Sequence, residues 1–272
     1  MTILLKKFIR FVLNGVLDYI ARTQKFSFPE KYIWQWKRDF LFGRYEKDTV
    51  ALFNKTIKTG MVVVDIGAHI GYYTRILSKL VGKKGAVYAF EADPENFKLL
   101  EKNTGHLSNV KRYQTAVMDR AGTVDFYHCE EKSGSHSVVA NIPVNLATRK
   151  ISVQSADLDG ILAGEDVATV DFIKMDIEGG EPIALRGMRN TLTKNNSIQM
   201  VFEFAPAWIS AGGVKPERFL EEIFSMGFKI FAANQDGFAD FYVYNPFDPR
   251  NTDPEYFFNI YCKRLIPPRF LK

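Results

Sequence analysis

The sequence predicts an α/β fold in which helices cover a mostly parallel sheet, and two observations predict it. The β-branched run Val62–Val64 is continuous, as in strands buried on both faces, and it leads through a glycine turn into helix-spaced residues 72–80. A second apolar run, residues 86–90, ends at Glu91, and helix-like and strand-like stretches alternate after it. We therefore expect successive parallel strands to be joined by helices.

The remaining elements follow from the same periodicities. Helices are predicted over residues 46–58, 94–105, 182–192 and 216–226, and strands over 110–116, 168–176, 197–204 and 228–232. Residues 238–244 and 256–262 are strand-like, and one of them is expected to be an antiparallel edge strand. Between the third and fourth strands, residues 122–129 and 149–154 alternate like antiparallel strands around a polar loop at 131–148.

The glycine turn has the chemistry of a nucleoside site. Gly67 and Gly71 are spaced G-x-x-x-G, whereas sites for a pyrophosphate prefer G-x-G-x-x-G. Asp65, two residues before the first glycine, would repel a pyrophosphate but would suit the ammonium of S-adenosylmethionine. Glu91 is placed to accept both ribose hydroxyls, and Asp93 is expected to cap the helix that starts at Pro94.

Three sequence blocks carry a family resemblance. They are Asp65-Ile66-Gly67-Ala68-His69-Ile70-Gly71, Phe90-Glu91-Ala92-Asp93-Pro94 and Lys174-Met175-Asp176-Ile177-Glu178-Gly179-Gly180-Glu181. With them the chain resembles the FkbM family of class I S-adenosylmethionine-dependent methyltransferases, from about residue 60 to about residue 235. The resemblance implies a Rossmann-like, seven-stranded class I methyltransferase sheet, mostly parallel with an antiparallel edge strand. It also implies O-methylation of a sugar, glycolipid or natural-product hydroxyl, without identifying the acceptor.

The cofactor site is expected at the carboxyl ends of the strands, where open α/β sheets bind ligands. By resemblance, residues after the third strand approach the adenine, and His69 packs beside the cofactor. The predicted cofactor-binding residues are Asp65, Gly67, Ala68, His69, Gly71, Tyr72, Glu91, Ala92, Ala116, Val117 and Asp176.

Methyl transfer to a neutral alcohol needs a base, because the hydroxyl loses its proton as the new bond forms. Lys174 is expected to point away from the cleft or to pair with a neighbouring acid. The predicted catalytic residues are Asp176, Glu178, Glu203 and His136, and Glu181 is either a further base or the first-turn carboxylate of its helix. The three carboxylates Asp176, Glu178 and Glu203 could instead bind Mg²⁺, but a metal-free general base is our expectation.

Charge and cysteine content limit the partners and the compartment. The net charge of +5 resides in residues 1–50, which hold ten Lys or Arg and five Asp or Glu, while the rest of the chain is balanced. Basic residues also follow Glu255, up to Lys272. Basic residues confined to the two ends do not resemble a nucleic-acid-binding face, so no nucleic acid is expected. Cys129 and Cys262 form no disulfide framework, which fits a cytoplasmic protein.

We divide the chain into an N-terminal extension, residues 1–58, and a methyltransferase domain, residues 59–272. Residues 3–21 are strongly apolar with one narrow polar stripe, and their longest uncharged run is too short to span a bilayer. This helix packs either on its own domain or a twin subunit, as in a homo-oligomer, or on the inner face of an anionic membrane with Lys6, Lys7 and Arg10 near the headgroups. The aromatic residues within 26–42 either cover the cleft or form the core of the extension.

Two other functions stay open. The basic ends favour an RNA methyltransferase, but the fourth strand is followed by Asp176-Ile177-Glu178-Gly179 rather than an Asn-Pro-Pro-Tyr-like motif. A non-catalytic cofactor-binding subunit would use the apolar N-terminal helix for docking. Intact acidic residues at the strand ends argue against this last alternative.

Overall fold

The computed structural model describes residues 3–130, 133–143, 146–234, 237–241, 243, 247–248, 253 and 255–264. The side chains of residues 3, 4, 6, 7 and 234 lie outside the described part. The predicted headgroup contacts of Lys6 and Lys7, and the basic residues from 265 to Lys272, therefore lie outside it as well.

One large sheet forms the centre of the molecule, with strand order β10-β9-β11-β8-β7-β1-β2-β3. Strands β3, β2, β1, β7 and β8 are mutually parallel, and β11 runs antiparallel to both β8 and β9. The strands are β1 Val62–Ile66, β2 Ala86–Glu91, β3 Val110–Gln114, β7 Phe172–Met175, β8 Gln199–Phe204, β9 Phe228–Asn234, β10 Gly237–Asp240 and β11 Phe258–Arg264.

The predicted fold class is confirmed, but the sheet has eight strands among the described residues rather than seven. Both strand-like C-terminal runs enter the sheet, β10 as the antiparallel edge strand and β11 between β8 and β9. Periodicity indicated that both runs are extended, but it could not show where each one pairs, because pairing depends on residues distant in sequence.

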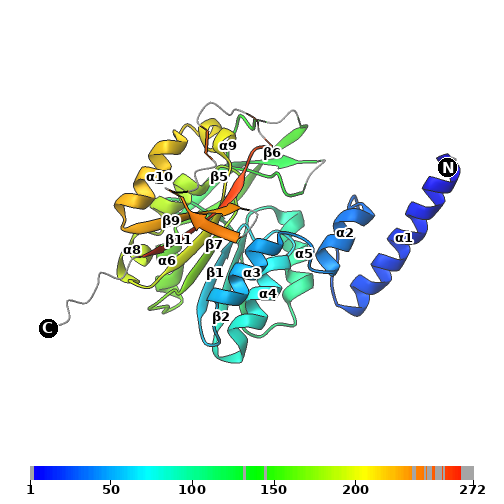
Figure 1. The fold of residues 1–272 in the computed structure, drawn as a ribbon, viewed down its shortest axis with the longest axis horizontal. Coiled ribbons are helices and arrows are strands. Elements are labelled where there is room, and N and C mark those ends of the chain that lie inside the picture. Colours follow the sequence, from blue (N-terminus) through cyan, green and yellow to red (C-terminus); the bar gives the residue numbers. More distant parts are fainter. Residues whose placement is uncertain are drawn as a thin grey trace.

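Helices cover both faces of this sheet (Figure 1). On one face, Phe53, Leu77 and Leu100 from three helices share a core with Val63 and Val87. On the opposite face, side chains of five helices join a second core with β7, β8 and β11. The first set is α3 Lys47–Thr56, α4 Tyr72–Val81 and α5 Pro94–Thr104, and the second is α6 Leu158–Gly164, α7 Glu181–Arg186, α8 Arg189–Lys194, α9 Pro206–Ala211 and α10 Pro216–Ser225.

The predicted helix over 182–192 is two short helices, α7 and α8. The break lies at Gly187, where an added Cβ would come within 1.8 Å of the carbonyl oxygen of Met118. The close contact of Gly187 with Met118 is a tertiary feature, so helical periodicity alone did not reveal the break. The helices α6 and α9, and α2 at Trp34–Leu41, were also not predicted.

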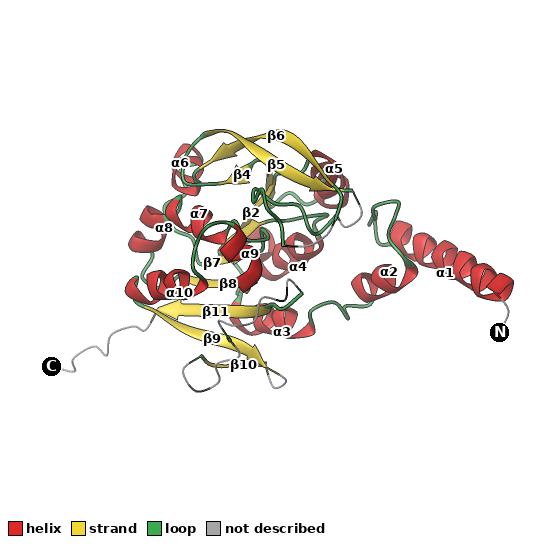
Figure 2. Cartoon of the chain, turned by 90° about the horizontal axis from the view of Figure 1, so that it is seen from above, coloured by secondary structure: helices red, strands yellow, loops and turns green. Residues whose placement is uncertain are grey.

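The predicted excursion between the third and fourth strands is confirmed as a separate sheet of order β4-β6-β5. Its strands are β4 Ala116–Val117, β5 Gly122–Cys129 and β6 Thr148–Ala156, and β5 pairs with β6 in antiparallel register. Figure 2 shows this sheet beside β2, between α5 and α6. Residues 133–136 of the loop from β5 to β6 lie close to the ends of β1, β2, β7 and β8, where a ligand is expected.

The N-terminal helix α1, Ile3–Thr23, packs against α2 and otherwise projects from the body (Figures 1 and 2). Leu17 and Ala21 are buried, and Asp18 accepts a 2.6 Å hydrogen bond from Nζ of Lys37. No helix among the described residues is long and apolar enough to cross a membrane. The division at residue 58 stays a prediction, and α3 on its N-terminal side already contributes to the core around β1.

Candidate active site

A cavity of about 1000 Å³ lies at the carboxyl ends of β1, β2, β7 and β8. Residues of the aromatic segment, including Tyr32 and Trp36, and the loop that follows β5 also line it. This is the expected ligand position in an open α/β sheet. The predicted site residues on its wall are Gly67, His69, Glu91, Ala92, Ala116, Val117, His136, Asp176, Glu178 and Glu203.

Four predicted cofactor-binding residues do not line the cavity, namely Asp65, Ala68, Gly71 and Tyr72. The carboxylate of Asp65 is fully buried and accepts a 2.6 Å hydrogen bond from Oγ1 of Thr74. Its other oxygen lies 3.6 Å from Nζ of Lys174. The Asp65 carboxylate, which was expected to bind the cofactor ammonium, thus contacts Thr74 and Lys174 of the protein itself.

Lys174 pairs with neighbouring acids, which was one of the two predicted arrangements. Its Nζ donates to the carbonyl oxygen of Gly67 at 2.8 Å and lies 3.7 Å from Oδ2 of Asp176. Burial alone would lower the pKa of Lys174, but the neighbouring carboxylates, Asp176 and Asp65 first among them, together outweigh it and raise that pKa. A buried ammonium therefore links β7 to the turn after β1.

The two glycines of the turn make room for protein groups. Gly67 has φ +73°, and an added Cβ would lie 1.8 Å from the carbonyl oxygen of Asp176. At Gly71, with φ +86°, it would lie 2.9 Å from Cγ2 of Thr104 and 3.0 Å from Cδ1 of Leu100. The G-x-x-x-G spacing therefore sets how closely the turn approaches β7 and α5.

Glu91 is a buried acceptor at the end of β2. Its Oε2 accepts the backbone N–H of His69 at 2.7 Å, and its Oε1 accepts that of Asp93 at 2.8 Å. Burial raises the pKa of Glu91 to about 7, although both hydrogen bonds act in the opposite direction. The carboxyl group is thus held at the cavity wall with unused acceptor capacity, since each ionised oxygen can accept two hydrogen bonds.

His69 connects the turn to the loop above it. Its Nε2 lies 3.0 Å from Oγ of Ser133 and 3.5 Å from the hydroxyl of Tyr32. The carbonyl of Ser133 accepts a 2.8 Å hydrogen bond from Nδ2 of Asn96 on α5. Burial lowers the pKa of His69 to about 3, so this ring is neutral at physiological pH.

Three carboxylates gather at the ends of β7 and β8. Single oxygens of Asp176, Glu178 and Glu203 all lie within 4.8 Å of one another. Burial, and then the charges of Asp176 and Glu178, raise the pKa of Glu203 well above its usual value. Ser137 of the β5–β6 loop donates to the carbonyl of Glu178 at 2.6 Å, which ties the loop to this acidic group. These oxygen ligands suit either a general base or a hard cation such as Mg²⁺.

Glu181 does not line the cavity. It is buried in the first turn of α7, and its Oε1 accepts the backbone N–H of Ile177 at 2.9 Å. Burial raises the pKa of Glu181 to about 7. This position fits the prediction that Glu181 is the first-turn carboxylate of its helix rather than a further base.

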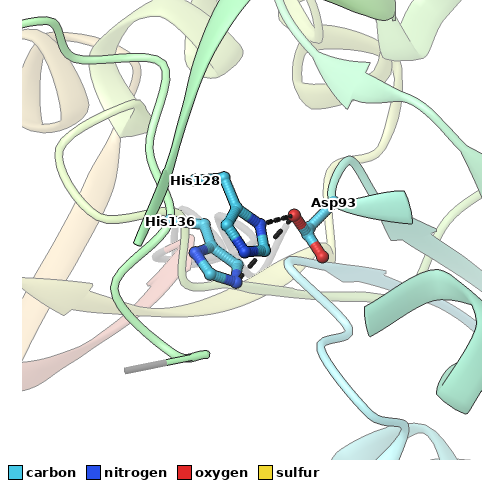
Figure 3. A group of neighbouring side chains, drawn as sticks. All are labelled: Asp93, His128 and His136. Carbon is cyan, nitrogen blue, oxygen red and sulfur yellow. Dashed lines mark hydrogen bonds and ion pairs between the residues drawn. The ribbon is translucent and has the colours of Figure 1, made fainter. Parts of the chain in front are cut away.

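A second titratable group, Asp93 with His128 and His136, was missed as a unit (Figure 3). The predicted cap is confirmed, because Oδ1 of Asp93 accepts the backbone N–H groups of Glu95 and Asn96, each at 2.9 Å. Oδ2 lies 2.5 Å from Nδ1 of His128 and 3.9 Å from Nε2 of His136. One sequence signal could have found His128, since strand alternation places it on the same face as the apolar Phe126.

Hydrogen bonds define which nitrogens of the two stacked rings carry protons. Nδ1 of His136 accepts the backbone N–H of Cys129 at 2.8 Å, and burial lowers the pKa of His136 to about 4. Its Nε2 therefore carries the proton of the neutral ring. Nδ1 of His128 lies 2.5 Å from Oδ2 of Asp93, so Nδ1 carries a proton and donates a hydrogen bond to this carboxylate. Because a metal ligand nitrogen needs a free lone pair, the Nε2 of His136 cannot bind a metal while the Cys129 bond persists.

The sequence matches the Methyltransferase FkbM domain family over residues 65–230. The 2-O-methyltransferase NoeI of Sinorhizobium fredii is 28% identical over 153 residues, which cover 52% of this chain and 63% of NoeI. The hexuronic acid methyltransferase AglP of Haloferax volcanii is 28% identical over 185 residues, 67% of this chain and 70% of AglP. The match thus spans slightly less than two thirds of NoeI. A solved SAM-dependent methyltransferase of Aquifex aeolicus aligns with a TM-score of 0.42 at 18% identity, over 80% of this chain and 89% of that chain.

Proposed function

Because the chain belongs to the FkbM methyltransferase family, we propose that it is an S-adenosylmethionine-dependent O-methyltransferase whose acceptor is a sugar hydroxyl. The observation that carries this proposal is that one cavity holds both Glu91 and the acidic group of Asp176, Glu178 and Glu203. Glu91 suits the ribose of a nucleoside, and the acidic group suits an acceptor hydroxyl that must lose a proton. The two relatives, a 2-O-methyltransferase and a hexuronic acid methyltransferase, support a sugar as the acceptor.

The cofactor fits the part of the cavity around β2. The carboxylate of Glu91 would accept the ribose hydroxyls, and Ala92, Ala116 and Val117 offer an apolar wall for the adenine. When bound, S-adenosylmethionine supplies an electrophilic methyl group on its sulfonium. The backbone of Gly67 and the ring of His69 would then hold the cofactor between β1 and the β5–β6 loop.

The acidic group at β7 and β8 would take the proton of the acceptor hydroxyl. A raised pKa makes Glu203, once ionised, a better proton acceptor than an ordinary glutamate at neutral pH. Asp176 and Glu178 help to raise it, because their negative charges disfavour a third one nearby. His136, with its proton on Nε2, would position the acceptor as a hydrogen-bond donor rather than act as the base.

Calorimetry and labelled-methyl transfer test the proposal. The chain should bind S-adenosylmethionine, and Glu91→Ala should weaken binding by at least about tenfold, since a buried acceptor is lost. The chain should also move the labelled methyl from the cofactor to one member of a panel of neutral sugars and uronic acids. No cofactor binding, or binding unaffected by Glu91→Ala, would refute the proposed site.

Removal of metal ions with EDTA tests the proposal that the base acts without a metal. We expect the rate to be unchanged by EDTA, because the proposed step needs only a carboxylate. Loss of activity in EDTA and its recovery with Mg²⁺ would assign the three carboxylates to a cation that lowers the hydroxyl pKa instead.

A further inference from the structure

The outer face of α1 is apolar and has no covering partner within the described residues. Phe8, Phe11 and Tyr19 are 64%, 77% and 69% exposed, and Val12 and Val16 between them are exposed as well. At 100° per residue these five positions fall on one side of the helix. The opposite side of the C-terminal half of α1, at Leu17 and Ala21, packs on α2, while the stripe itself faces outward. Exposed apolar surface of this extent marks an interaction site.

Exposed apolar side chains also lie where the extension meets the cavity. Ile33 and Trp36 are about half exposed, and both also line the cavity of the candidate active site. Trp36 lies on α2, the helix on which α1 packs. One exposed part of the cavity lining, at Ile33 and Trp36, is therefore joined to the apolar stripe through α2.

The net charge of the N-terminal residues decides whether a second copy of the chain or a lipid surface covers this stripe. Residues 1–50 carry a net charge of +5, and the remainder of the chain carries none. Arg10 and Arg22 of α1 are exposed, whereas Asp18, the acidic residue of the helix, is paired with Lys37. A second copy docked on this face would bring two such positive segments together, at an electrostatic cost. A surface of anionic lipid headgroups complements the same charge.

We propose that α1 is an interfacial helix that docks the protein on an anionic phospholipid surface, with Phe8, Phe11 and Tyr19 at the boundary between headgroups and acyl chains. The aromatic residues suit that depth, because aromatic rings concentrate at membrane interfaces. Given the function proposed above, docking through the α1–α2 pair would bring the part of the cavity lining at Ile33 and Trp36 close to the membrane. The acceptor is then a sugar carried on a lipid rather than a free sugar.

Vesicle flotation of the full chain tests the docking. The chain should float with vesicles of phosphatidylcholine and phosphatidylglycerol and not with pure phosphatidylcholine, and about 0.5 M NaCl should weaken binding. The double variant Phe8→Asp/Phe11→Asp should reduce the bound fraction at least tenfold. Its matched control is Phe224→Asp on α10, a phenylalanine that is 56% exposed on the opposite part of the fold, which should bind like the wild type. Circular dichroism confirms that both variants are folded.

Two results would overturn the docking. One is the absence of flotation with anionic vesicles. The other is a dimer in sedimentation velocity that Phe8→Asp/Phe11→Asp dissociates, because it would assign the stripe to a second copy of the chain.

The acceptor class is tested separately. A lipid-linked sugar in anionic vesicles should be methylated at least tenfold faster than the same sugar free in solution, and Phe8→Asp/Phe11→Asp should remove the difference. Equal rates on both acceptors would refute the lipid-linked acceptor while leaving the proposed methyltransferase function intact. Vesicle binding without methyl transfer to any sugar would refute the proposed function while leaving the docking intact.

Discussion

Asp93 and His128 are joined by a 2.5 Å contact between Oδ2 and Nδ1, and the other oxygen of Asp93 caps α5. One carboxylate thereby fixes the start of a helix and the proton position of a histidine in the cavity wall. The contact joins the central fold to the inserted β5 strand, two segments that are 35 residues apart in sequence.

Substitutions at Asp93 should separate these two roles. Asp93→Ala removes the cap and leaves Nδ1 of His128 without an acceptor, so it should cost about 2–4 kcal/mol of unfolding free energy. Asp93→Asn keeps a good cap, and its amide N–H₂ would face His128 and move the ring proton to Nε2. Urea denaturation measures the first effect and ¹⁵N chemical shifts of the histidine ring measure the second. A His128 ring whose proton stays on Nδ1 in Asp93→Asn would contradict this assignment.

Cofactor binding should depend on pH through Glu91. Its carboxylate accepts hydrogen bonds when ionised, and burial raises its pKa to about 7. Binding of S-adenosylhomocysteine should therefore be about tenfold weaker near pH 6 than near pH 8, since the ionised fraction falls by that factor. The pKa values of His69 and His136 are too low for either ring to titrate in this range.

Glu91→Gln is the control for this titration. It should bind more weakly than the wild type and lose the pH dependence, as measured by calorimetry at both pH values. A pH dependence that survives in Glu91→Gln would assign it to another group, such as Glu181, whose pKa burial also raises to about 7.

The rate of methyl transfer should fall at low pH, because the proposed base Glu203 must be ionised to accept a proton. Glu203→Gln should lower kcat by about 10²–10⁴. Glu178→Gln removes a negative charge that helps to raise the pKa of Glu203, so it should move the acidic limb of the kcat profile to lower pH. If the acidic limb of the kcat profile does not move in Glu178→Gln, the base is a residue other than Glu203.

The raised pKa of Glu203 also makes the stability of the folded protein depend on pH. The pKa of Glu203 is higher in the folded than in the unfolded protein, so its contribution to stability is lost as pH rises through the folded value. Glu203→Gln, which never ionises, should therefore be more stable than the wild type at high pH and gain little at low pH. Thermal denaturation across this pH range measures the difference.

Lys174 should be necessary for folding stability because it offsets buried negative charge. Its Nζ lies 3.6 Å from Asp65 and 3.7 Å from Asp176. Lys174→Met leaves the fully buried Asp65 without its cation and should cost about 3–5 kcal/mol. Adding Asp65→Asn should restore part of that loss, as judged by urea denaturation of the single and double variants. A double variant no more stable than Lys174→Met would show that the two groups are not coupled.

Local patterns predicted the parts of the fold and site that depend on neighbouring residues. Residues 62–66 and 86–91 are strands, the Asp93 cap precedes Pro94, and the 122–129 strand has the predicted bounds. The single helix predicted over 182–192 was wrong, because the chain forms two helices there and Gly187 between them packs closely against the distant Met118. Asp65 was assigned to the cofactor from its position relative to the glycines, and this assignment stays a prediction. Its pairing with Lys174, 109 residues later, could not be predicted from local pattern.

Short-range periodicity was enough to predict the α/β class and the acidic residues at the strand ends, and three motif blocks were enough to indicate the family. The folded arrangement was needed to show which side chains face the cavity, how β11 enters the sheet between β8 and β9, and that His128 and His136 stack beside Asp93. These arrangements arise from contacts between segments far apart in the chain. Their energies depend on burial and on hydrogen-bond partners, which are properties of the packed molecule.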